Sequence, residues 1–150
     1  MTTTKFTPIL LGSDINVYGM ARSFHELTGE KIQAIASVQY APTRFSKIVE
    51  VELHAGFNED PVFIETMRQI AKRYENHQEP VILVSCSDGY TELIAKHKEE
   101  LSKTFVCPCV DYDFLKQLNN KERFYKIAEE HHLPHPETKI ITPDDYKQQN

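Results

Sequence analysis

The fold of this chain is decided by the stretch Ile9-Leu10-Leu11-Gly12-Ser13-Asp14-Ile15-Asn16-Val17. Its apolar start predicts a short strand, Gly12 ends that strand, and the polar residues that follow suit the start of a helix. Apolar residues then recur at helical spacing, at Val17, Met20, Ala21 and Phe24. Gly29 is suited to end this helix in a left-handed conformation. A strand that leads directly into an amphipathic helix is typical of an α/β sheet.

The alternation of strands and helices continues along the chain. Further strands are predicted at 32–38, 48–53, 81–84 and 104–107, and helices over 60–74, 90–101, 111–118 and 120–130. The run 48–53 alternates apolar and charged residues, as a half-exposed edge strand does, whereas 81–84 is wholly apolar, as in a central parallel strand. Only nine residues, 39–47, separate the second and third strands, which is too short for a helical crossover. The predicted fold is a Rossmann-like α/β domain with an open, mainly parallel sheet flanked by helices. The second and third strands are expected to interrupt its regular alternation of strand and helix.

Composition limits the class of protein. The chain has 150 residues, 40% of them hydrophobic and 26% charged, which suits one globular domain. The net charge of −5 argues against a nonspecific nucleic-acid binder. No apolar run approaches the roughly 18 residues that span a bilayer, and the run 6–11 is too short for a signal peptide. We therefore expect a cytoplasmic protein that binds neither nucleic acid nor membrane.

The cysteines and histidines do not predict a metal site. The three cysteines, Cys86, Cys107 and Cys109, are an odd number in a chain of this class, so we expect buried thiols at strand ends rather than disulfides. Cys107-Pro108-Cys109 lacks the spacing and the second ligand pair of a zinc site. Histidines gather at 131–135, where the end of the predicted helix favours partial positive charge.

Two strand-to-helix loops, 12–16 and 85–89, are the candidate ligand site. Ligands of open α/β sheets lie at the carboxyl ends of the strands, and helix N-termini there favour anions such as carboxylate or phosphate. Arg22, about two turns into the first helix, is placed either to bind a carboxylate or to form a surface ion pair. The same polar residues are also good helix caps whatever the function. Because 12–17 lacks the further glycines of a dinucleotide fingerprint and no Walker lysine motif occurs, the residues alone define a small-ligand module.

The end of the chain has the pattern of a domain junction. An amphipathic helix is predicted at 120–130. It is followed by His-Leu-Pro-His-Pro at 132–136 and by a brief predicted strand at 138–141. Thr142-Pro143-Asp144-Asp145 then carries a helix-start pattern with only five residues behind it. We therefore expect a fragment of a larger protein.

Three segments in order along the chain resemble the ATP-grasp carboxylate–amine ligases. They are Gly12–Arg22, Ser87–Leu101 and Asn120–Pro136, the last of which resembles the link into the ATP-grasp domain. Within that superfamily the chain is most similar to the D-aspartate ligase and carbamoyl-phosphate-synthase-like branch. The resemblance implies a pre-ATP-grasp domain over residues 1–136, with 137–150 as the start of an ATP-grasp domain that this chain lacks.

The resemblance also implies a chemistry. Such ligases use ATP and Mg²⁺ to activate a carboxylate as an acyl phosphate, which an amine attacks. This chain is expected to contribute substrate binding, with no cofactor, catalytic residue or metal ligand of its own and no activity alone. The residues expected to face a small-molecule carboxylate or amine are Gly12, Ser13, Asp14, Asn16, Arg22, Ser87, Asp88 and Tyr90. Lys121 is expected on the surface of the linker helix.

Other interpretations stay open at this point. The main alternative is a free-standing α/β domain that binds a small ligand or regulates another protein. A phosphoacceptor receiver would need an acidic cluster, of which Asp14 supplies one carboxylate, while Cys86-Ser87 stands where the acceptor would be convenient. Half of a nucleotide-binding oxidoreductase is disfavoured by the missing glycines. Neither the amino acid and amine that are joined nor the choice between monomer and homodimer follows from the sequence.

Overall fold

The structure, a computed structural model, describes residues 5–139 and 141. Its strands are β1 (Thr7–Leu11), β2 (Ile32–Ala36), β3 (Val49–Leu53), β4 (Val81–Ser85) and β5 (Phe105–Val106). Its helices are α1 (Ile15–Thr28), α2 (Ala41–Arg44), α3 (Asp60–Tyr74), α4 (Asp88–Lys96), α5 (Lys98–Leu101), α6 (Tyr112–Asn119) and α7 (Lys121–Glu130). The alternation of strands and helices predicted from the sequence is confirmed.

The strands form one sheet in the order β3-β2-β1-β4-β5, and every neighbouring pair is parallel. In its register, Ile9 of β1 lies opposite Gln33 of β2 and Leu83 of β4. The edge position predicted for β3 and the internal position predicted for β4 are both confirmed. The order reverses at β1, since the chain first builds the sheet outward to β3 and then returns to add β4 on the other side.

One prediction about this sheet is wrong. The link between β2 and β3 does contain a helical crossover, the one-turn helix α2, and the two strands are parallel. Pro42 stands in the first turn of α2, where its fixed φ angle suits a helix and its missing N–H is not needed. A single helical turn is enough to carry the chain across the sheet here, so a short link between two strands still allows them to pair in parallel.

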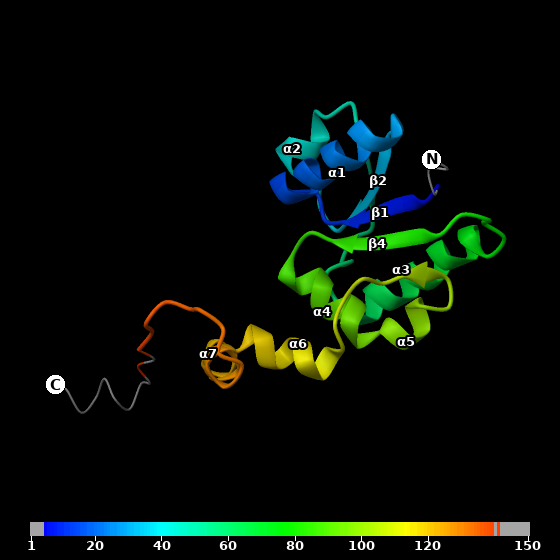
Figure 1. The fold of residues 1–150 in the computed structure, drawn as a ribbon. Coiled ribbons are helices and arrows are strands. Elements are labelled where there is room, and N and C mark those ends of the chain that lie inside the picture. The colour runs from blue at the N-terminus through cyan, green and yellow to red at the C-terminus, as the bar shows by residue number, and fades with distance from the viewer. Residues whose placement is uncertain (1–4, 140, 142–150) are drawn as a thin grey trace. The chain divides into compact units, whose positions relative to one another are not determined.

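Helices cover both faces of the sheet (Figure 1). α1 and α2 lie on one face, and α3, α4 and α5 on the other. Successive strand residues point to opposite faces, so Leu10 packs with Val17 and Ala21 of α1, whereas Ile9 and Leu11 belong to the core under α3 and α4. We call these the α1-side core and the α3-side core. Each is a continuous set of buried apolar side chains.

Several elements are shorter than the sequence predicts, among them β2, which ends at Ala36 and not at residue 38. The helical spacing over 90–101 is divided at His97, which lies between α4 and α5 with φ −106° and ψ 17° and contacts the Asp60 carboxylate at the start of α3. The predicted strand at 104–107 keeps two residues, because the N–H of Cys109 bonds the carbonyl of Cys107 at 2.8 Å and turns the chain around Pro108. The three cysteines are free thiols, but they are only partly buried and not buried as expected.

The chain divides into two compact units, residues 1–111 and 112–150. In the second unit α6 packs against α7, and Leu115 and Ala128 are buried. His131 caps the end of α7. The division at Asp111 describes how the chain packs into compact units and does not test where one domain of the larger protein ends. The domain boundary expected at 136 therefore stays a prediction.

The predicted strand at 138–141 is wrong for the residues that are described. Thr138, Lys139 and Ile141 have no strand conformation, and the five paired strands of the sheet all lie between residues 7 and 106. Without a neighbouring strand, an apolar run has nothing to pair with. Residue 140 and the helix start predicted at 142–145 lie outside the described residues.

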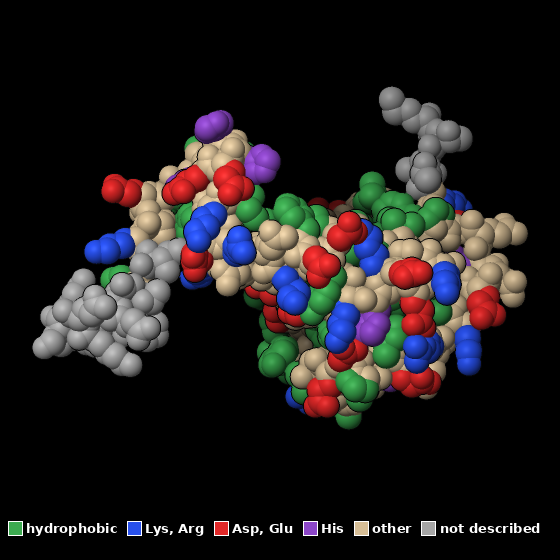
Figure 2. Space-filling model, turned by 90° about the horizontal axis from the view of Figure 1, so that it is seen from below, with side chains coloured by type: hydrophobic (Ala, Val, Ile, Leu, Met, Phe, Trp, Pro, Cys, Tyr) green, Lys and Arg blue, Asp and Glu red, His purple; other side chains and the backbone are tan. Residues whose placement is uncertain are grey.

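The surface carries both signs of charge. Figure 2 shows acidic and basic side chains mixed over the face seen from below. Some of them form ion pairs, as Arg68 of α3 does with Glu100 of α5 through two hydrogen bonds of 2.6 and 3.0 Å. Among the described residues, no helix is long and apolar enough to cross a membrane.

Candidate functional site

A hollow of about 440 Å³ lies at the carboxyl ends of β1, β2 and β4. We call it the carboxyl-edge cleft. It is lined by Leu11, Gly12, Ser13, Asp14, Ala36, Ser37, Val38, Tyr40, Asn58, Cys86, Ser87 and Tyr90. These residues come from the connections that follow β1, β2, β3 and β4, so four strand-to-helix links meet there. The cleft includes the loops after β1 and β4, where the strand order reverses, which is the usual ligand position of an open α/β sheet.

Gly12 lets the chain turn from β1 into α1 at the floor of the cleft. Its φ of +118° is one that L side chains rarely adopt. A Cβ atom here would lie 3.1 Å from Cγ2 of Val17 and 3.7 Å from the ring of Tyr90. Both the backbone angle and the space therefore require glycine.

Asp14 and Asn16 form the start of α1. The Asp14 carboxylate Oδ1 accepts hydrogen bonds from the backbone N–H groups of Asn16 at 3.0 Å and Val17 at 3.2 Å. The Asn16 side-chain amide donates to the carbonyl of Cys86 at 3.5 Å, which joins the loop after β1 to the loop after β4. Asp14 thus lines the cleft and caps the helix at the same time.

Ser13 joins the loops after β1 and β2. Its side chain is 3% exposed, and its hydroxyl donates to the carbonyl of Val38 at 2.6 Å and accepts from the N–H of Tyr40 at 3.4 Å. The hydroxyl of Thr43 in α2 donates to the Ser13 carbonyl at 2.6 Å. These hydrogen bonds use both the hydroxyl and the carbonyl of Ser13, so the main effect of Ser13 is to hold one wall of the cleft in place.

Ser87 and Tyr90 form the opposite wall. The Ser87 hydroxyl caps α4 by accepting from the N–H of Tyr90 at 3.4 Å. The Tyr90 ring is 9% exposed and packs on Phe57, with ring centroids 5.4 Å apart. Within the described part of the chain, the Tyr90 hydroxyl has no hydrogen-bond partner. This hydroxyl is available to a ligand.

The structure does not bring Arg22 and Asp88 into this cleft. Arg22 pairs with Glu26 at 2.8 Å on the outer surface of α1, with both side chains about two-thirds exposed. Asp88 is the exposed first residue of α4. The other six residues expected from the sequence either line the cleft or, in the case of Asn16, bond to its wall.

Sequence reasoning missed several residues of the cleft. They are Ser37, Val38, Tyr40, Asn58 and Cys86. The first three follow β2, whose link to β3 was not expected to contain a helix, and Asn58 precedes α3. The rule that ligands gather at the carboxyl ends of parallel strands would have found all of them, had it been applied to each strand.

The cleft is weakly charged. Among the described residues that line it, Asp14 alone has a carboxylate, and none is a lysine, arginine or histidine. Burial, and to a smaller extent the charge of Asp14, raise the pKa of the Cys86 thiol to about 11. Cys86 is therefore neutral at pH 7 and a poor nucleophile.

The described residues do not fit the phosphates of ATP or a bound Mg²⁺ ion. Among them, no group of three His, Cys, Asp or Glu side chains is arranged to hold a metal. The lining of the cleft also lacks the basic side chains that usually accompany phosphate. We assign no step of a reaction through these groups to this chain.

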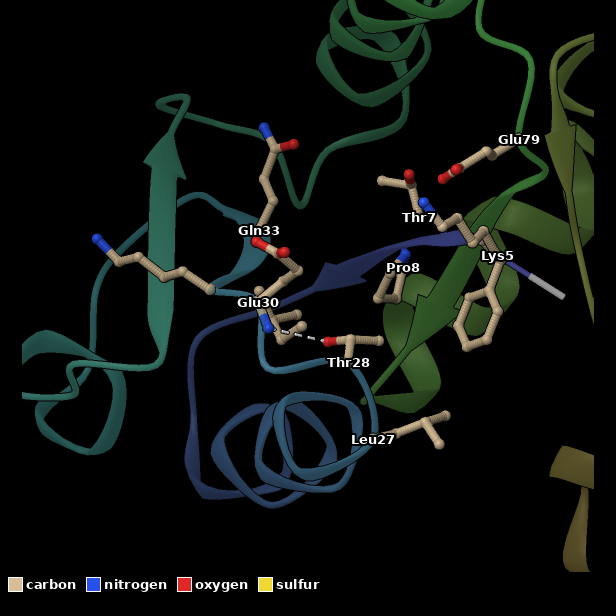
Figure 3. A pocket seen from close by; sticks show the side chains of 11 residues that line it. Lys5, Thr7, Pro8, Leu27, Thr28, Glu30, Gln33 and Glu79 are labelled. Carbon is tan, nitrogen blue, oxygen red and sulfur yellow. Dashed lines mark hydrogen bonds between the residues drawn. The ribbon is translucent and has the colours of Figure 1, made fainter. Parts of the chain in front are cut away.

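A larger hollow, of about 590 Å³, lies at the amino ends of β1 and β2 (Figure 3). It is lined by the start of β1, the end of α1 and Glu79 before β4, and it holds both acidic and basic side chains. The one hydrogen bond drawn there joins the N–H of Glu30 to the Thr28 hydroxyl at 3.1 Å. Because it lies at the opposite edge of the sheet from the strand-to-helix loops, it is the weaker candidate for a ligand site.

An open parallel sheet with helices on both faces and a cleft at the carboxyl ends of its strands defines an open-sheet α/β domain. The chain is 56% identical over 138 residues to D-aspartate ligase of Enterococcus faecium (strain Aus0004), a match that covers 91% of this chain and 33% of that enzyme. The chain thus spans about a third of the length of the curated relative that it matches. The resemblance to ATP-grasp ligases of the D-aspartate ligase branch is thereby confirmed.

A solved structure supports the fold. The L-amino acid ligase from Bacillus licheniformis aligns with a TM-score of 0.62 at 15% identity, over 95% of this chain and 36% of that one. The chain therefore shares its α/β fold with about a third of that L-amino acid ligase. The biotin carboxylase domain of a single-chain bacterial carboxylase aligns with a TM-score of 0.49 at 14% identity, over 95% of this chain and 34% of that one. No family model matches the chain.

Proposed function

We propose that this chain is the substrate-binding, pre-ATP-grasp domain of an ATP-dependent ligase that joins an amino acid to an amine. The observation that carries the proposal is the 56% identity to D-aspartate ligase, which makes D-aspartate the first candidate for the amino acid. The carboxyl-edge cleft supports it, since about 440 Å³ is room for a ligand of amino-acid size.

The residues of the cleft take different roles in this proposal. Asp14, Ser87 and Tyr90 present polar groups to the substrate, while Gly12 leaves room for it. Ser13 and Asn16 position the loops through their hydrogen bonds. Arg22 and Asp88 would contact only a part of the substrate that extends beyond the cleft.

ATP and Mg²⁺ belong to the full-length enzyme in this proposal. They would convert the substrate carboxylate into an acyl phosphate for the amine to attack. This chain would bind and orient the substrate and be inactive by itself. Residues 1–136 would form the domain and 137–150 the start of the ATP-grasp domain, and the enzyme would act in the cytoplasm on small molecules rather than on nucleic acid.

The test uses the full-length protein and measures ADP release with a panel of amino acids that includes D-aspartate. Asn58→Ala, in the cleft, should raise KM for the accepted amino acid by roughly 3- to 10-fold through a lost hydrogen bond. Asn76→Ala is the matched control, because Asn76 is also exposed but follows α3, before β4 begins.

The outcomes separate clearly. A raised KM in Asn58→Ala alone supports the cleft as the substrate site. Equal kinetics in the two variants would remove the cleft from the proposal. Failure of every amino acid to stimulate ADP release would overturn the ligase assignment itself.

A further inference from the structure

The charge inside the carboxyl-edge cleft indicates which end of a substrate it takes. An amino acid offers carboxylates and an ammonium group. The cleft lining contains one carboxylate, that of Asp14, and no cationic side chain. Arg22, which the sequence suggests as a carboxylate partner, is paired with Glu26 outside the cleft. A carboxylate placed beside Asp14 would face repulsion without a compensating cation.

The two helix starts at the cleft are already capped. At α1, the Asp14 carboxylate takes the N–H groups of Asn16 and Val17, and its negative charge offsets the positive end of the helix dipole. At α4, the Ser87 hydroxyl takes the N–H of Tyr90, and Asp88 adds a negative charge in the first turn. The usual reason for an anion to bind at a helix N-terminus is therefore largely removed here.

The same groups suit a cation. An ammonium group carries three N–H donors and needs acceptors. Among the described residues, the second carboxylate oxygen of Asp14, Oδ2, accepts only a long hydrogen bond of 3.4 Å from the Asn16 side-chain amide. The Tyr90 hydroxyl and the Asn58 side chain also line the cleft, and neither has a hydrogen-bond partner within the described chain.

We propose that the carboxyl-edge cleft binds the ammonium group of the amino-acid substrate, with Asp14 as its counter-charge. This inference rests on the proposed function and adds the orientation of the substrate to it. The carboxylates of the amino acid then point out of the cleft. Asp14 is a binding residue in this scheme and takes no part in the chemical step.

The experiment measures binding to the full-length protein by calorimetry, with three probes. D-Aspartate has both groups, D-aspartate dimethyl ester keeps only the ammonium, and N-acetyl-D-aspartate keeps only the carboxylates. We expect the first two to bind and the third not to bind. Asp14→Asn keeps a good helix cap and removes the charge, so it should weaken the first two by about 10- to 100-fold.

Asp113→Asn is the control, since it removes a carboxylate from the first turn of α6, outside the cleft, and should change no affinity. Binding of N-acetyl-D-aspartate as tight as that of D-aspartate, or an Asp14→Asn variant with unchanged affinities, would overturn the proposal. Asp14→Asn should keep the urea midpoint of the wild-type protein, because Asn caps a helix about as well as Asp does; weakened binding together with a lowered midpoint would indicate a purely structural role of Asp14 and overturn the proposal. ADP release by the wild-type protein distinguishes these results from a failure of the ligase assignment, in which no amino acid stimulates release.

Discussion

Single residues set the geometry of the cleft, and Gly12 is the clearest of them. Gly12→Ala places a Cβ atom 3.1 Å from Val17 at a φ of +118°. We expect a loss of roughly 1–3 kcal/mol in the free energy of unfolding. Gly19→Ala is the control, because Gly19 lies within α1 with nothing within 4 Å of a new Cβ atom. Gly19→Ala should raise the free energy of unfolding by about 0.5–1 kcal/mol, with both variants measured by urea titration. An unchanged free energy of unfolding in Gly12→Ala would contradict the strained conformation.

Glu52 should make stability depend on acid pH. A hydrogen bond from Arg73, with help from His54, lowers the pKa of the Glu52 carboxyl from 4.5 to about 2. A carboxyl whose pKa is lower when folded contributes stability that is complete above its unfolded pKa and is lost as the pH falls through the folded one. We therefore expect about 1–2 kcal/mol to be lost between pH 5 and pH 2, allowing for partial exposure of the pair.

The measurement compares wild type with Glu52→Gln in urea unfolding at several pH values. The difference in the free energy of unfolding should be largest near pH 7 and shrink toward pH 2, because the wild-type carboxylate is then protonated. A difference that stays constant across this range would show that the Arg73 bonds, at 2.7 and 2.8 Å, do not carry the effect.

Residue identities in the cleft were predictable where a local rule applied. Asp14 and Ser87 were expected as caps and are caps. Arg22 was placed only by its distance along a helix, which does not specify the direction of a long side chain, and it pairs with Glu26. Tyr40 and Asn58 follow β2 and β3, so they come to the cleft through the pairing of parallel strands, and only a rule applied to every strand end of the sheet points to them.

At the scale of elements, the end of α7 offers a test of helix termination. His132 has φ 52°, the N–H of Leu133 bonds the carbonyl of Ala128 at 2.8 Å, and that of His132 bonds Glu129 at 3.1 Å. This is a Schellman ending with a residue other than glycine in the left-handed position. His132→Gly should stabilise α7 by roughly 0.5–1 kcal/mol.

Hydrogen exchange of the α7 amides would measure this change. His131→Gly is the control, since His131 has φ −96° and gains nothing from glycine. Equal effects of the two substitutions would argue against the left-handed position as the source of the gain.

Element type was more predictable than element connection. The apolar periodicity of α1 and α3 and the wholly apolar β4 were sufficient to predict each of them. The link from β2 to β3 was not, because α2 is a single turn with no periodicity to detect. Its buried Thr43 fixes it through a hydrogen bond to Ser13, far away in the sequence.

For the whole molecule, the sequence predicted the sheet class and its relationship to ATP-grasp ligases, while the division into units came from the structure. Residues 111–118 were expected as a short helix of the same domain, yet the compact unit ends at Asp111. The boundary at Asp111 reflects contacts between residues that are distant in the sequence. The boundary expected at 136 was inferred from local signals, the prolines and helix caps at 132–145, so the two boundaries measure different properties.

The two cores predict which part of the chain folds as one body. Every residue of the α1-side and α3-side cores lies between Ile9 and Cys109. A chain that ends at Asp111 should therefore keep the urea midpoint of the main unfolding transition. A chain that ends at Glu99 loses Leu101 and Phe105 from the α3-side core and should be about 4 kcal/mol or more less stable. Unfolding of the chain ending at Asp111 in water would show that the second unit is needed for the sheet to fold.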